Sequence, residues 1–248
     1  MAKVEFGETW VYESIVSALP GVDVSKPLAI AIQLVAFQVG VTLVWWVYEF
    51  PTETLLAGTA AVVVATLGSI EMLRISRLVR AERLPDSYGR LLFGSSIEVV
   101  LAVLAFVALV TYLFTTGTSD APSLLERLFG EEPPVVAVYL TLLVLWDVCY
   151  RIGTAWWAAV VALWRSVRFR FDEPTARALR RADLEVVAFS TAQLILVPFV
   201  RDQPVIVAVI VGHVVAVWVV AGLSVALVTA RAETADGATA DANAAARE

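Results

Sequence analysis

Six long apolar blocks restrict the fold of this chain more than any other feature of its sequence. They cover roughly 27–49, 54–75, 91–115, 135–164, 184–200 and 205–229. A helix needs about 20 residues to cross a hydrocarbon core of about 30 Å, and the blocks are of that order. They lack the two-residue alternation of a membrane barrel, and only helices and closed barrels satisfy their backbone in lipid. We therefore expect an all-α, polytopic integral membrane protein with six transmembrane helices.

The composition supports the same interpretation. Apolar residues make up 59% of the 248 residues and the mean hydropathy is +0.79, whereas soluble domains average about 45–50% apolar residues. The single cysteine, Cys149, excludes an intrachain disulfide and a thiolate metal site. The N-terminus lacks the pattern of a cleaved signal peptide, so we expect the first block to insert and remain. The net charge of −6, with 16 Arg and 2 Lys, is typical of GC-rich or halophilic sequences.

The basic residues outside the blocks predict how the chain is threaded. Fifteen of them fall in the N-terminal segment, the second loop, the fourth loop and the tail, whereas only Arg127 and Arg201 fall in the alternate segments. Loops rich in Lys and Arg stay cytoplasmic. We therefore expect both termini to be cytoplasmic, in a protein of the plasma membrane.

Three regions follow from this pattern. Residues 1–26 form a cytoplasmic segment with an amphipathic helix at the membrane surface, 27–229 form the transmembrane domain, and 230–248 form a polar tail expected to be disordered. Ser123 and Glu126 have the spacing of a capping box, which predicts a short helix outside the membrane. Pro174 predicts that the fifth helix begins there, before its apolar block.

Basic side chains form two stripes on the cytoplasmic extensions of the second and fifth spans. Their members are Arg74, Arg77, Arg80, Arg177, Arg180 and Arg181. One interpretation is that these stripes set the topology and contact anionic lipid headgroups. The alternative is a cytoplasmic site for an anionic ligand or a protein partner.

Carboxylates inside the apolar blocks need a separate explanation, because a charge at mid-helix costs about 2.5–3.5 kcal/mol on insertion scales. Glu71 lies three residues before Arg74, and we expect it to pair with that residue at the membrane surface. Glu98 lies on the order of 10 Å inside the membrane, judged from about 1.5 Å of rise per residue. The small residues Gly94, Ser95 and Ser96 precede it, and they predict close packing of another helix.

Asp147 and Arg151 stand near the centre of the fourth block, with the spacing and order of a favourable helical ion pair. The simplest interpretation is a structural pair that fixes this helix against its neighbours. In the functional interpretation, Arg151 also meets Glu98. Two acids and one arginine then leave a surplus negative charge or a shared proton.

Further polar residues fall near mid-depth in other spans, namely Gln38, Gln193 and His213. A lone histidine is more often a packing residue than a switch, and it cannot form a histidine-rich metal site alone. With Glu98, Asp147 and Arg151, these residues form the candidate intramembrane polar site, provided that they face one another rather than lipid.

The sequence motifs leave three classes of function open for this protein. No metalloprotease, nucleophile-elbow, phosphate-loop or dinucleotide motif is present, so we assign no catalytic residue, metal or cofactor, and an intramembrane enzyme is the least supported class. An ion- or proton-linked transporter or channel would use the intramembrane site. A non-catalytic scaffold or sensor would use the basic stripes. Membrane lipids are the expected partners, nucleic acid is not, and a protein partner or homo-oligomer stays open.

Overall fold

The computed structural model is a helical bundle, and it describes residue 10, residues 25–115 and residues 123–245, with side chains up to 232. Its elements are α2 (Lys26–Val47), α3 (Thr52–Ala81), α4 (Asp86–Phe93), α5 (Ile97–Thr115), α6 (Leu124–Phe129), α7 (Val135–Arg168), α8 (Glu173–Ala192), the 3₁₀ helix η1 (Gln193–Phe199) and α9 (Pro204–Ala245). Within the described residues, six segments are long and apolar enough to cross a membrane. The expected class, all-α with six candidate spans, is therefore confirmed.

Prolines mark the starts of most of these helices. A proline fits the first turn because the amide hydrogen it lacks has no partner there. Prolines occupy the position before, or the first turn of, α2, α3, α4, α7, α8 and α9; they are Pro27, Pro51, Pro85, Pro134, Pro174 and Pro204. The predicted early start of the fifth span is confirmed, because α8 begins at Glu173.

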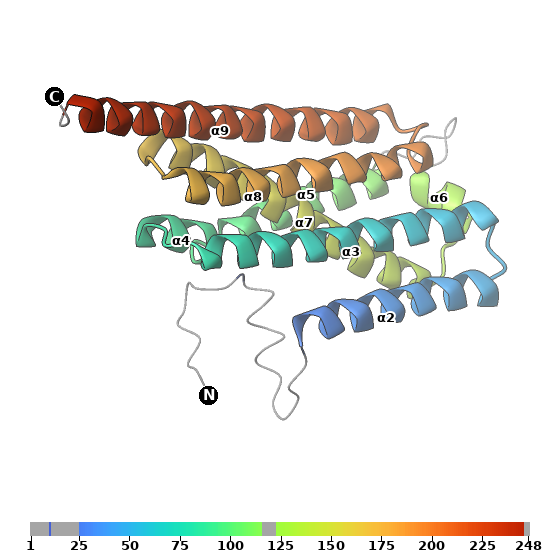
Figure 1. Cartoon of the computed structure of the whole chain (residues 1–248). Coiled ribbons are helices and arrows are strands. Elements are labelled where there is room, and N and C mark those ends of the chain that lie inside the picture. Colours follow the sequence, from blue (N-terminus) through green and yellow to red (C-terminus); the bar gives the residue numbers. More distant parts are fainter. Residues whose placement is uncertain (1–9, 11–24, 116–122, 246–248) are drawn as a thin grey trace.

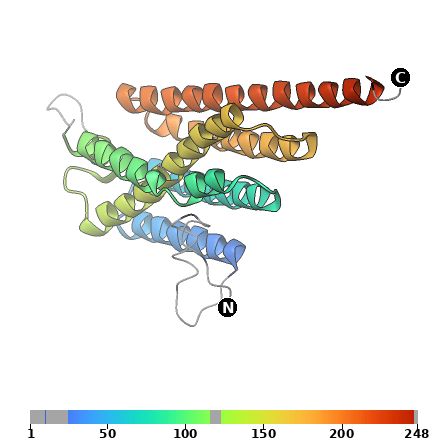
Figure 2. The same cartoon turned by 90° about the vertical axis from the view of Figure 1, so that its left-hand side faces the viewer.

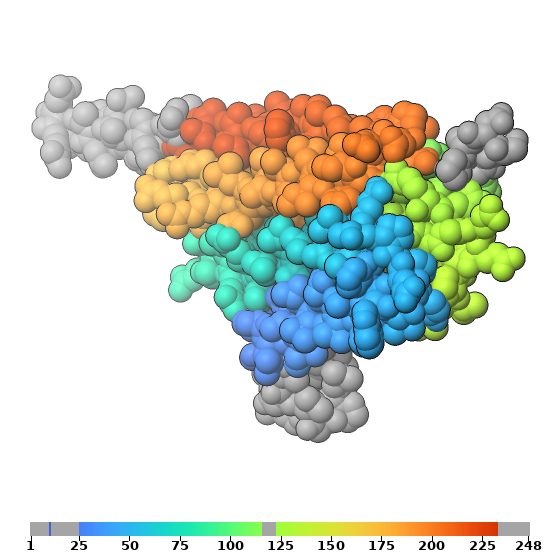
Figure 3. Space-filling model, turned by 90° about the vertical axis from the view of Figure 1, so that its right-hand side faces the viewer, coloured from blue at the N-terminus to red at the C-terminus, as the bar shows by residue number. Residues whose placement is uncertain are grey.

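Helix α7 organises the bundle. It crosses obliquely behind a layer in which α2, α3, α8 and α9 lie in that order, and α5 packs on α7 (Figures 1 and 2). Figure 3 shows α2 and the start of α3 on the outside of the bundle, with η1 next to the start of α3. No residue of α2 is buried, and its outer face carries exposed apolar side chains such as Leu28, Ile32 and Val39. Apolar residues turned outward indicate a lipid-facing surface.

The third candidate span is broken rather than continuous. Helix α4 ends at Phe93 and α5 begins at Ile97, with Ser96 in the left-handed region at φ 55°. Gly and Ser form helices poorly, and such pairs are common causes of sharp kinks. The indole of Trp157 on α7 donates a hydrogen bond to the Leu91 carbonyl at 3.0 Å, which holds the break against the core.

The fifth candidate span changes from α-helix to 3₁₀ helix near its C-terminal end, which is remote from the arginine-rich start of α8. At Gln193 the α-helix passes into the 3₁₀ helix η1, which contains Pro198. Proline cannot donate the usual helical hydrogen bond, and a 3₁₀ segment within a longer helix often marks strain or a hinge. Two of the six candidate spans are therefore discontinuous.

The structure describes only parts of the two chain ends. The predicted surface helix in 1–26 lies outside the described residues, apart from Trp10, which is buried and edge-to-face with Phe93 at 4.8 Å. At the other end, helix α9 extends to Ala245. Its alanine-rich sequence favours helix. Arg231 also donates hydrogen bonds to the Ser166 and Val167 carbonyls at the end of α7.

Candidate functional site in the bundle interior

The predicted ion pair on α7 is present and lies inside the bundle. Arg151 Nη2 donates a hydrogen bond to Asp147 Oδ1 at 2.8 Å. Arg151 is fully buried and Asp147 is 7% exposed. Because a charge in the apolar interior is costly unless paired, the two groups compensate each other there.

Two neighbouring helices complete the surroundings of this pair. On α2, Gln33 Nε2 donates to Asp147 Oδ2 at 2.5 Å, so both carboxylate oxygens of Asp147 are hydrogen-bonded. On α3, Met72 Sδ lies 3.4 Å from Arg151 Nη1. Helix α3 comes this close because Gly68 faces Arg151: a Cβ added at Gly68 would lie 2.6 Å from the Arg151 Cβ.

Glu71 does not occupy the position expected from its sequence neighbours. The predicted pairing with Arg74 is wrong, because Arg74 Nη2 lies 2.6 Å from Glu185 Oε1 on α8. Glu71 is only 4% exposed, and within the described part of the chain neither of its carboxylate oxygens has a hydrogen-bond partner. Arg74 reaches outward across to α8, whereas Glu71 turns into the bundle one turn from Gly68.

Glu98 lies in the first turn of α5, directly after the break, and is fully buried. Its backbone carbonyl faces α7, where a Cβ added at Gly153 would lie 3.2 Å from it. Among the described residues neither Glu98 carboxylate oxygen has a hydrogen-bond partner, so Glu98 does not form the hydrogen bond to Arg151 that would support the functional interpretation. The expected depth of Glu98 was based on a continuous helix from Arg90, but the helix is interrupted between α4 and α5.

The remaining predicted polar residues have other surroundings. Gln38 Nε2 donates to Thr59 Oγ1 at 2.9 Å, and the His213 ring lies 6.0 Å from the Trp156 ring. Gln193 is 1% exposed at the start of η1. In the described ranges, no hydrogen bond joins any of these three to Asp147 or Arg151. Among the described residues, Asp147 and Arg151 are therefore the two of the six predicted residues that a hydrogen bond joins to each other.

A second buried ion pair, whose two members lie just outside the predicted apolar blocks, joins α7 to α8. Arg165 Nη2 donates to both carboxylate oxygens of Asp183, at 2.7 and 2.8 Å, and the two side chains are 1% and 2% exposed. Arg165 Nη1 donates to the Tyr88 hydroxyl on α4, and Ser224 on α9 donates to Asp183. Four helices thus meet at a buried ion pair in which both carboxylate oxygens are hydrogen-bonded, an arrangement typical of a structural role.

The predicted basic stripes are partly neutralised. Glu173 lies 2.7 Å from Arg180 and 3.4 Å from Arg177, and Arg74 pairs with Glu185. The guanidinium of Arg80 lies over the Phe93 ring at 4.8 Å. Arg77 and Arg181 are exposed.

Comparison with known proteins identifies the family. Residues 5–224 match a family described as a family of unknown function, DUF7530. The chain belongs to the DUF7530 family. No curated protein and no solved structure matches it. Because the match extends over every buried carboxylate and arginine described above, these groups lie within the part of the DUF7530 chain that defines the family. Among the residues that the structure describes, no three His, Cys, Asp or Glu side chains group to hold a metal ion.

Proposed function

We propose that this DUF7530 protein is a small proton-linked transporter or channel that works through buried carboxyl groups around α7. The observation that carries the proposal is a charge mismatch in the bundle interior. Three buried carboxyls, Glu71, Glu98 and Asp147, lie on α3, α5 and α7, and among the described residues only Asp147 forms an ion pair with the buried guanidinium of Arg151. Arg151 pairs with Asp147, while the carboxylates of Glu71 and Glu98 have no hydrogen-bond partner in the described chain.

This mismatch has a chemical consequence. An unpaired carboxylate in an apolar span is expensive, so such a group carries a proton for much of the time or is neutralised by a passing cation. Ionisable residues inside membrane spans commonly mark proton relays and ion pathways. In this proposal Glu71 and Glu98 load and release the proton, and Arg151 sets the charge of Asp147.

The two discontinuous spans support the same proposal. Irregular backbone at membrane depth is tolerated where it is buried in protein or lines a cavity, and transporters often place their binding groups at such breaks. Here Glu98 follows the α4–α5 break, and Gln193 opens the 3₁₀ segment η1. Both side chains are buried.

We further propose that the protein lies in the plasma membrane with both termini and the arginine-rich loops in the cytoplasm. The asymmetry of Lys and Arg between alternate segments supports this orientation. Since α7 runs toward the arginine-rich end, Glu98, which packs beside Gly153, then lies on the cytoplasmic side of Asp147. The carboxyls are thus spread along the membrane normal, as a relay requires.

Proton flux into liposomes tests the proposal. The purified protein is reconstituted with a pH-sensitive dye inside the vesicles, and the flux is followed after a pH step and after steps in sodium or potassium. We expect wild-type flux above that of protein-free vesicles, and loss of that flux in Glu71→Gln and Glu98→Gln. Glu131→Gln, at an exposed position, is the matched control and should keep the wild-type flux. Wild-type vesicles that are as tight as protein-free ones to every ion would overturn the proposal.

A non-catalytic scaffold or sensor is the second candidate. The exposed Arg77 and Arg181 at the arginine-rich end support it, since neither is engaged by a carboxylate in the described structure. In that case Asp147→Asn lowers only folding stability. A partner captured by the wild-type protein is then lost from the double variant Arg77→Ala, Arg181→Ala.

A further inference from the structure

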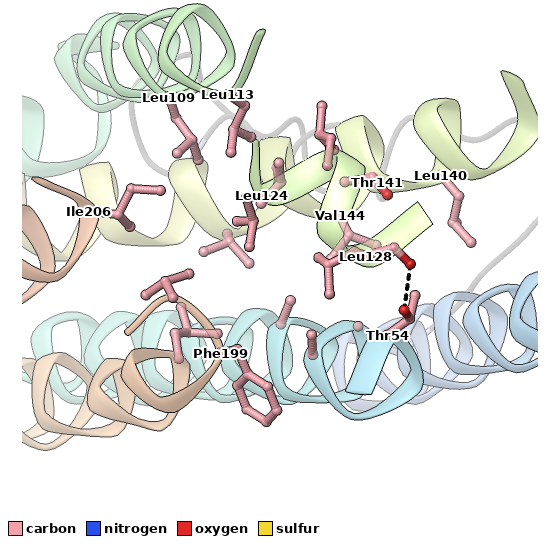
Figure 4. A pocket seen from close by; sticks show the side chains of 18 of the residues that line it. Thr54, Leu109, Leu113, Leu124, Leu128, Leu140, Thr141, Val144, Phe199 and Ile206 are labelled. Atoms are coloured by element: carbon pink, nitrogen blue, oxygen red, sulfur yellow. Dashed lines mark hydrogen bonds between the residues drawn. The ribbon is translucent and has the colours of Figure 1, made fainter. Parts of the chain in front are cut away.

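A cavity of about 280 Å³ lies in the half of the bundle that is remote from the arginine-rich end. Figure 4 shows side chains from several helices pointing into it, among them Leu109 and Leu113 on α5 and Ile206 on α9. Protein interiors contain few voids larger than a water molecule. A cavity nearly twice the size of the roughly 150 Å³ engineered void that binds benzene indicates a place for a ligand.

The lining of this cavity is almost entirely apolar. Small residues on α3, α5 and α7, such as Ala61, Ala105 and Ala137, create the space, and leucine, isoleucine and valine side chains fill most of the wall. Thr54 also lines it, but its hydroxyl already donates to the Leu128 carbonyl at 2.6 Å. Such a wall fits a hydrocarbon chain and offers little to an ion or a water-soluble molecule.

The shape of the cavity suits a long, thin occupant. On α7 its lining extends from Ala137 to Ile152, which is about 22 Å at about 1.5 Å of rise per residue. Ala105 on α5 and Val209 on α9 line the cavity and are also exposed. Because α5 packs mainly on α7 rather than on α9, the cavity opens sideways between α5 and α9, toward the lipid-facing surface.

One end of the cavity carries features of the membrane interface. Helix α6 closes this end with Leu124, Leu125 and Leu128. The helix is held there by its capping box and by the ion pairs of Arg127 with Glu53 and Asp202. Trp45, near the end of α2, also lines the cavity, and its indole N–H has no hydrogen-bond partner among the described residues. Tryptophan is enriched where lipid ester carbonyls lie.

We propose that this cavity holds one acyl chain of a phospholipid from the surrounding bilayer. The chain enters between α5 and α9 and lies along α7 toward Cys149. The occupant removes the cost of an empty apolar void. This inference does not depend on the proposed proton pathway, because the cavity wall contains neither Glu71 nor Glu98.

Photo-crosslinking in bilayers tests the inference. The full-length protein is reconstituted into phosphatidylglycerol–phosphatidylcholine vesicles that contain a phospholipid with a diazirine on its acyl chain, and crosslinked residues are located by mass spectrometry. Val144, Val148 and Cys149 are the diagnostic positions, because they line the cavity and are at most 5% exposed. We expect crosslinks at these buried positions as well as at outward-facing residues such as Leu104 and Val107.

A matched pair of variants separates cavity entry from general lipid contact. Ala105→Trp obstructs the opening, whereas Ala108→Trp, also exposed on α5, leaves the lining unchanged. Crosslinks at 144–149 should fall to background in Ala105→Trp and persist in Ala108→Trp and in Glu98→Gln. If Ala105→Trp fails to fold, the positions of the crosslinks in the wild-type protein test the inference by themselves. Crosslinks confined to outward-facing residues would overturn the inference.

Discussion

Arg74 on α3 forms its ion pair with Glu185 on α8, at 2.6 Å, and not with Glu71 on its own helix. Two residues before Glu185, Asp183 forms the buried pair with Arg165. The ion pairs that join α8 to α3 and to α7 therefore differ in exposure: Arg74 is 59% exposed, while Arg165 and Asp183 are almost completely enclosed. This difference decides what each pair contributes to stability.

Asp183→Asn should destabilise the protein far more than Glu185→Gln. The first change leaves the buried Arg165 without its counter-charge, which costs about 3–5 kcal/mol. The second breaks a partly exposed pair, and such pairs contribute about 0–1 kcal/mol. The free energy of unfolding in detergent micelles, measured by denaturant titration, checks both values. Equal losses for the two variants would show that the Arg165–Asp183 pair is not enclosed as described.

The two glutamines of α2, Gln33 and Gln38, should also contribute differently to the free energy of unfolding. Gln33 donates to the charged Asp147, and hydrogen bonds to charged groups contribute about 1.5–3 kcal/mol, against about 0.5–1.5 kcal/mol for neutral ones. Gln38 donates to the neutral hydroxyl of Thr59. Gln33→Leu should therefore lower the unfolding free energy more than Gln38→Leu, as measured by the same titration. The opposite order would contradict the contact between α2 and Asp147.

Gly68→Ala should be costly although it adds only one methyl group. A Cβ at this position would lie 2.6 Å from the Arg151 Cβ and 2.7 Å from the Phe189 ring, and overpacking of this kind typically costs about 1–3 kcal/mol. Gly212→Ala on α9 is the control, since nothing lies within 4 Å of its notional Cβ. A thermal melt in detergent should show a lower midpoint for Gly68→Ala only. Equal midpoints would rule out the close approach of α3 to α7.

The helices were predictable because each depends on a local signal. Runs of apolar residues locate the six spans, Pro174 locates the start of α8, and Ser123 with Glu126 gives the capping box that the structure contains. The Asp147–Arg151 pair was predictable for the same reason, because partners four residues apart on one helix meet whatever the tertiary packing.

The rest of the site depends on how the helices face one another, which local signals do not determine. Asp183 lies just before the fifth apolar block and was not counted among the intramembrane carboxylates, yet it is buried and pairs with Arg165 across two helices. Helical periodicity could have favoured Gln33 over Gln38 as the glutamine of α2 that faces α7. Gln33 lies two turns before Gly40, whose notional Cβ lies 3.4 Å from Leu140 of α7, and residues seven apart share a helix face. No local pattern indicates that Arg74 reaches α8 and leaves Glu71 inside.

The orientation of the bundle gives a last prediction, tested by labelling single cysteines in intact cells. In a Cys149→Ala background, we expect Glu131→Cys to react with a membrane-impermeant maleimide, and Ser87→Cys to react only after permeabilisation. Ser87 lies in the first turn of α4, between Arg83 and Arg90, and arginine-rich segments between spans are retained in the cytoplasm. Both positions are exposed, so reactivity reports the side of the membrane rather than burial. Labelling of Ser87→Cys alone in intact cells would reverse the proposed orientation and place Glu98 on the outer side of Asp147.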